Sequence, residues 1–96
     1  MDTMTRIAEL TAECIKNNWP DTEGLPEASE LRNLLAVPPD PAMGDYAFPC
    51  FKLAKVMRKA PAMIAADLAA KINGNEVFEK VENVNAYVNM FMILFI

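Results

Sequence analysis

Four basic side chains within one short stretch of the chain have the spacing needed to bind phosphate groups together. They are Lys52, Lys55, Arg58 and Lys59. Spacings of three, three and one residues place them on one face of a helix that starts after Cys50. The other side of that helix is expected to pack Phe51, Ala54 and Met57 into the core. A solvated helix face is the ordinary interpretation of such a pattern, and a local phosphate-binding patch is the functional alternative.

The charge of the chain favours a local interaction with nucleic acid over a general one. The 96 residues carry 9 basic and 13 acidic side chains, for a net charge of −4. A general nucleic-acid binder is usually basic. Residues 41–75, however, carry five basic and two acidic side chains, whereas the segments on either side are acidic. The basic segment could contact phosphates while the rest of the surface repels RNA non-specifically.

The residue types that catalysis needs are scarce in this chain. It has no histidine, which removes the commonest general base and metal ligand. Cys14 and Cys50 lie far apart and form no zinc motif. The three glycines are isolated, so no phosphate-binding loop is present. Acidic pairs such as Glu79 and Glu82 are typical of a solvated strand. We therefore predict no catalytic residue, no metal site and no cofactor within this chain.

The elements that must position the basic residues can be read in chain order. Apolar residues at three- and four-residue spacing predict a first helix that ends near Asn18, before Pro20. Leu31–Val37 is predicted to form a strand, and Tyr46–Phe48 a second strand antiparallel to it across a proline-rich link. Two helical pieces follow, with Pro61 in the first turn of the second piece.

The end of the chain is predicted to form a second hairpin. Gly74 suits a left-handed position after the helices. Weak period-two alternation predicts a strand from Val77 to Asn83, then a turn, and then a last strand at Tyr87–Phe91. The element order is helix, two strands, helices, two strands. This order predicts an α+β two-layer sandwich, with a four-stranded antiparallel sheet and helices on one face, as a single domain over residues 1–96.

The sequence also bears on the compartment in which the chain works. Residues 1–18 are amphipathic and do not resemble a signal peptide. With two cysteines the chain needs no disulfide framework, and a reduced, cytoplasmic setting is expected. The apolar tail at residues 90–96 is far shorter than the roughly 20 residues that span a bilayer, so no membrane partner is expected.

Two strings of residues resemble a known family. The first is PPDPAMGDYAFPCF at residues 38–51, followed by LAK at 53–55 and RKAP at 58–61. The second is NAYVNMF at residues 85–91. Together they resemble the N-terminal additional domain of bacterial arginyl-tRNA synthetase, over roughly residues 1–92. Ala86 stands where that family commonly carries glycine, a residue that allows backbone conformations alanine does not.

The resemblance implies a fold that agrees with the predicted one, and it implies binding of the outer corner of arginine tRNA. Tyr87 would stack on a base of the dihydrouridine loop, and Asn89 would hydrogen-bond the edge of that base. Residues two apart on a strand point to the same face, so ring and amide can meet one base. Asn85, on the same face again, would add an edge contact, with Asn83 a weaker candidate. Alternatively, Tyr87 packs in the core and Asn89 is an ordinary exposed strand residue.

The basic helix face described above would then contact tRNA phosphates. The family's catalysis belongs to a following domain, which uses ATP with Mg²⁺ and is absent from this chain. The expected partners are therefore arginine tRNA and that catalytic domain, and this chain is not expected to activate arginine. The apolar tail is interpreted as the last strand and an end produced by truncation. The alternative function is a protein-interaction or dimerisation module that uses the apolar C-terminal strand.

Overall fold

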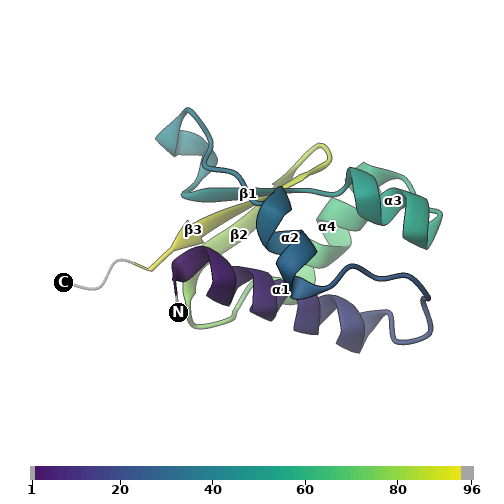
Figure 1. Ribbon diagram of the computed structural model, residues 1–96. Helices are drawn as coiled ribbons and strands as arrows, with labels where there is room; N and C mark the ends of the chain where they lie inside the picture. The colour runs from purple at the N-terminus through teal and green to yellow at the C-terminus, as the bar shows by residue number, and fades with distance from the viewer. Residues whose placement is uncertain (1, 94–96) are drawn as a thin grey trace.

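The computed structural model describes residues 2–93, which form four α-helices and a three-stranded antiparallel sheet (Figure 1). The elements in chain order are α1 (Thr3–Asn18), α2 (Ala28–Leu34), the short 3-10 helix η1 (Pro41–Met43), β1 (Tyr46–Pro49), α3 (Phe51–Met57), α4 (Pro61–Ile72), β2 (Phe78–Val84) and β3 (Tyr87–Met92). The strand order is β1-β3-β2, so the last strand of the chain is the central strand of the sheet. The predicted α+β class is confirmed.

The core lies between the sheet and the helices. Helix α4 packs on β2 and β3, and α1 packs on both α4 and α2. Figure 1 shows α3 beyond one end of the strands. The largest fully buried core side chains include Phe48, Leu53, Leu68 and Met90. Because β3 is paired on both sides, its position is determined by two neighbouring strands and by α4 beneath it.

The prediction of a strand at Leu31–Val37 is wrong, because most of this segment belongs to helix α2. Leucines 31, 34 and 35 repeat at helical spacing, and both Leu31 and Leu35 are buried. Residues 28–36 contain no β-branched residue, which also favours helix over strand. Only Ala36 keeps a sheet contact, a single antiparallel bridge to Ala47 with N–O distances of 3.0 and 2.8 Å. The sheet consequently has three strands and not the predicted four.

Several predicted boundaries are confirmed. Helix α1 ends at Asn18, and Trp19 is half-buried against the core beyond it. Pro61 occupies the first turn of α4. Gly74 has a φ of +100°, the left-handed conformation that the sequence predicted there. At the start of α1 the Thr5 backbone N–H donates to the Asp2 carboxylate over 2.7 Å, so one of the backbone N–H groups without a partner inside the helix is satisfied.

The apolar tail is only partly within the described residues. Strand β3 ends at Met92, and the Ile93 N–H donates to the Val77 carbonyl over 3.2 Å. Residues 94–96 of the predicted tail lie outside the described residues. No helix within residues 2–93 has both the length and the apolar character that crossing a bilayer requires.

Candidate nucleic-acid interface

Tyr87 and Asn89 lie on the central strand β3 and share one face of it. Successive strand residues point to opposite faces. Val88 and Met90 are fully buried on the face that α4 covers. Tyr87 and Asn89 therefore both point to the face of the sheet away from α4. The two-residue spacing predicted that they share a face, and the position of α4 shows which face it is.

The Tyr87 ring is exposed and contacts a second exposed ring. Tyr87 is 44% exposed, so it does not pack in the core. Its ring centroid lies 5.8 Å from that of Phe51, and the two ring planes meet at 82°. Phe51 is 51% exposed, so the prediction that it packs in the core is wrong. It is the first residue of α3, and the core position in that first turn belongs to Leu53.

Asn89 is buried rather than exposed. It is 2% exposed, and its Nδ2 atom has no hydrogen-bond partner among residues 2–93. Its neighbours across the sheet are Ala47 on β1 and Glu82 on β2. A buried donor without a partner costs about 1–3 kcal/mol, whereas an apolar side chain of the same shape does not. The stability of this fold therefore gives no reason for an asparagine at position 89.

This conclusion predicts the effect of replacing the amide. Asn89→Leu is expected to be at least as stable as the native chain, because leucine has a similar branched shape and leaves no donor unpaired. The matched control is Asn73→Leu, because the Asn73 Oδ1 atom accepts the Val81 N–H over 3.1 Å. That variant should lose about 1 kcal/mol. Urea unfolding measures both, and a clear loss of stability in Asn89→Leu would contradict the argument.

The structure separates Asn85 and Asn83 from this face. Asn85 was expected to continue the row of Tyr87 and Asn89, but it lies in the turn before β3, with a left-handed φ of 51°. Asparagine tolerates that conformation, so the turn begins there. Asn83 pairs with Val88, and directly paired residues point to the same face. Asn83 therefore points to the face that α4 covers, opposite to Tyr87.

The backbone of the β2–β3 turn explains why alanine is tolerated at position 86. Within residues 2–93 the non-glycine residues with positive φ are Arg58 and Asn85, so Ala86 does not need the freedom of glycine. The carbonyl of Ala86 accepts the Cys50 N–H over 2.9 Å. This bond ties the β2–β3 turn to the start of α3.

The four basic residues are exposed, but they do not all lie on one helix. Lys52 and Lys55 lie on α3, whereas Arg58 follows the end of α3 in a left-handed conformation and Lys59 is in the connection to α4. The ion pairs within residues 2–93 join Arg32 to Asp2 and Lys80 to Glu82. The four candidate cations thus have no acidic partner in the described part of the chain.

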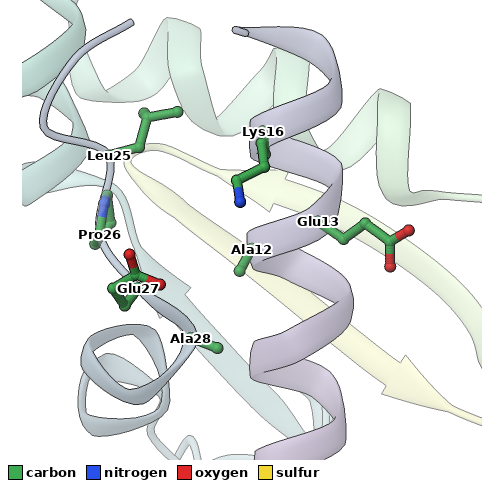
Figure 2. A pocket seen from close by; sticks show the side chains of 7 residues that line it. All are labelled: Ala12, Glu13, Lys16, Leu25, Pro26, Glu27 and Ala28. Atoms are coloured by element: carbon green, nitrogen blue, oxygen red, sulfur yellow. The ribbon is translucent and has the colours of Figure 1, made fainter.

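Two surface depressions lie elsewhere on the molecule. One, of about 240 Å³, separates α1 from the segment before α2, and Figure 2 shows Lys16 extending into it while Glu13 points away. Its lining includes the basic residue Lys16 and the acidic residues Glu13 and Glu27. The other, of about 500 Å³, lies beside Gly74 and Arg6. Neither depression is lined by Tyr87, Asn89 or the four basic residues.

The groups in the described residues that could bind a metal or react as thiols are the carboxylates and the two cysteines. Among residues 2–93 no three or more cysteine, aspartate or glutamate side chains converge. Both cysteines are free. Burial raises the pKa of the Cys50 thiol to about 12, so the reactive thiolate does not form at neutral pH.

The fold and the site define a class of small α+β domain, in which a central antiparallel strand carries an exposed ring and a buried amide beside a basic helix. The family model described as arginyl tRNA synthetase N terminal domain matches residues 5–92. The chain belongs to this family.

Similar proteins agree with this membership. An arginine–tRNA ligase of Clostridium beijerinckii is 42% identical over 92 residues, which cover 96% of this chain and 15% of that protein. One from Clostridium perfringens is 59% identical over 66 residues, covering 69% of this chain and 12% of that protein. The solved Thermus thermophilus arginyl-tRNA synthetase has 27% identity and a TM-score of 0.71, with 96% of this chain and 14% of that one covered. The chain thus spans only about one seventh of the length of these proteins.

Proposed function

We propose that this chain binds the outer corner of arginine tRNA and positions the tRNA for the catalytic domain of an arginine–tRNA ligase. An unpaired base of the dihydrouridine loop stacks on Tyr87, and Asn89 hydrogen-bonds the edge of that base. The observation that carries the proposal is the buried Asn89 amide, whose Nδ2 donor has no partner among the described residues 2–93 and lies two residues from an exposed ring on the same face. Membership of the arginyl-tRNA synthetase N-terminal domain family is the reason for proposing tRNA as the RNA that is bound.

The two side chains have different roles in this proposal. Stacking on the ring supplies affinity of ~1–3 kcal/mol and accepts any base. The amide supplies selectivity, because its donor and acceptor read the edge of one base. Since Asn89 is beneath the surface, a neighbouring side chain must move for the base to reach it, and such rotamer changes are common at interfaces. An acceptor on the base then satisfies Nδ2, which regains the cost of the unpaired donor.

The polar and basic residues around this pair extend the contact. Asn85 at the tip of the adjacent turn contacts the same nucleotides from outside the strand. Lys52 and Lys55, which follow Phe51 on α3, contact phosphates, and Arg58 and Lys59 extend the basic surface beyond the helix. Charges of this kind position RNA and speed its association without reading sequence.

The chemistry of the whole protein is also part of the proposal. Arginine, ATP and Mg²⁺ are bound by the catalytic domain of the longer protein, which acts in the cytoplasm. The residues of this chain do not fit ATP, since Gly24, Gly44 and Gly74 lie in three separate turns and build no phosphate-binding loop. No step of the ligase reaction is assigned to this chain.

Titration of the chain with arginine tRNA tests the proposal. Backbone and side-chain amide shifts are followed at low salt, beside a second tRNA that carries a changed base in the dihydrouridine loop. We expect Tyr87, Asn89 and their neighbours to shift with the first tRNA and much less with the second. If both tRNAs shift only the lysine-bearing helix, Tyr87 and Asn89 are structural. If neither tRNA binds while the chain associates with itself as its concentration rises, the interaction-module alternative is favoured.

The phosphate contacts predict a change in salt dependence. Lys52→Gln and Lys55→Gln are each expected to reduce the slope of log affinity against log salt by roughly 0.7–0.9, because each phosphate contact releases about that many counterions. Both tRNAs should weaken equally, since phosphates carry no sequence information. Lys16→Gln on α1 is the matched control and should leave the slope unchanged. An unchanged slope in the α3 variants would show that these lysines are only a solvated face.

A further inference from the structure

Phe51 and Tyr87 form an exposed aromatic pair at one end of the sheet. Their ring centroids are 5.8 Å apart, at an interplanar angle of 82°, and both side chains remain about half exposed. Perpendicular rings attract each other because the positive edge of one meets the negative face of the other. The contact therefore orients the Tyr87 ring without burying it.

The backbone holds the two residues of this pair in place. Tyr87 begins β3 opposite Pro49, the last residue of β1. The next residue, Cys50, donates its N–H to the carbonyl of Ala86 over 2.9 Å. Phe51 and Tyr87 thus follow two residues that are joined to each other by a hydrogen bond. The rings meet because the start of α3 and the start of β3 are tied together.

The perpendicular arrangement limits what Phe51 can do. Two rings that sandwich one base must be nearly parallel, and these two rings are not. An edge-to-face contact covers at most one face of the Tyr87 ring, and the residue stays 44% exposed beside Phe51. Phe51 therefore acts on a stacked base through the orientation of Tyr87.

We infer that Phe51 is a positioning residue that orients the Tyr87 ring before RNA binds, and that it joins the base-stacking position to the lysines of α3. This inference rests on the proposed function, in which Tyr87 stacks on an unpaired base. A ring that is already oriented loses less side-chain freedom on binding, which strengthens the complex. Because Phe51 is the first residue of α3, the same helix sets the place of the ring and the place of the phosphate contacts.

A double-mutant cycle tests the inference with the whole 96-residue chain and an arginine tRNA transcript. Phe51→Leu is expected to weaken binding by roughly two- to tenfold, the range to which edge-to-face aromatic energies convert. It should also reduce the preference over a transcript with a changed dihydrouridine-loop base, and leave the salt dependence unaltered. Phe51→Tyr should keep both affinity and preference. In the Tyr87→Ala background, Phe51→Leu should cost nothing further.

Each other outcome identifies which idea fails. If Tyr87→Ala weakens binding and Phe51→Leu does not, the inference is overturned while the proposed function stands. If Phe51→Leu costs as much without Tyr87 as with it, Phe51 does not act through that ring. If Tyr87→Ala itself has no effect, both ideas fail. Thermal unfolding of each variant checks the fold. Met63→Ala, at an exposed apolar position on α4, is the matched control for the loss of an exposed apolar side chain at Phe51.

Discussion

Replacing Tyr87 by alanine is expected to weaken binding of arginine tRNA between about fivefold and about a hundredfold. This range is the ~1–3 kcal/mol that base stacking on an aromatic side chain contributes. The ring is 44% exposed, so its loss removes little core packing and the stability of the fold should change little. The variant should also lose most of its preference for the native dihydrouridine-loop base, because the base is no longer held against Asn89.

The experiment compares three chains under one salt condition. Tyr87→Phe keeps the ring and should bind within about twofold of the native chain, since stacking uses the ring face and not the hydroxyl. Fluorescence titration with labelled tRNA gives the affinities, and thermal unfolding confirms that each chain is folded. Unchanged affinity in a folded Tyr87→Ala chain would reject base stacking at this position. Sedimentation at increasing concentration would then test the interaction-module alternative.

Replacing Gly44 by alanine is expected to reduce the free energy of unfolding by roughly 2–6 kcal/mol, the sum of a backbone-strain contribution and a crowding contribution. Gly44 has a φ of +107° and a ψ of 180°, a conformation that is almost confined to glycine and strains other residues by ~1–3 kcal/mol. In addition, a Cβ atom there would lie 2.9 Å from the backbone carbonyl oxygen of Met90. This carbonyl belongs to the backbone of the central strand, which cannot rotate away as a side chain can. Crowding is therefore expected to add ~1–3 kcal/mol to the loss of stability.

Gly74→Ala provides the control for the crowding at Gly44. Gly74 has a similar φ of +100°, but a Cβ atom there would meet nothing within 4 Å. It should therefore show only the strain of the left-handed conformation. Urea unfolding of both variants measures the difference, which contains the contact with β3 and the difference in backbone strain between the two positions. Equal losses in the two variants would show that β1 and β3 move apart freely at this point.

Gly44 and Asp45 also show why the string at residues 38–51 could be recognised from the sequence alone. Asp45, the next residue, donates its N–H to the Met90 carbonyl over 2.9 Å, and its carboxylate accepts the Met92 N–H over 2.8 Å. The glycine and the aspartate thus pair β1 with the central strand that carries Asn89. Few residue types can adopt such a backbone conformation or accept such a hydrogen bond. A short string of these residues is therefore recognisable without the structure.

The elements whose signals are local were predicted well. The first helix, the break at Pro61, the left-handed Gly74 and the β2–β3 hairpin all follow from residues close together in the chain. The helix at Ala28–Leu34 was missed, because a short apolar run is compatible with either a strand or a helix until its neighbours are known. Its helical form is stabilised by packing of Leu31 and Leu35 against the rest of the core.

The sequence by itself determined the class of fold and the family, and it proposed Tyr87 and Asn89 for the candidate site, because residue types and short spacings record those features directly. The tertiary structure alone decided that β3 is the central strand, that Phe51 meets Tyr87, and that Asn89 is buried with a donor that no other residue of the described part of the chain pairs. Each of these depends on contacts between segments distant in the chain. Burial and ring contacts are properties of such segments packed together, and no local pattern of residues encodes them.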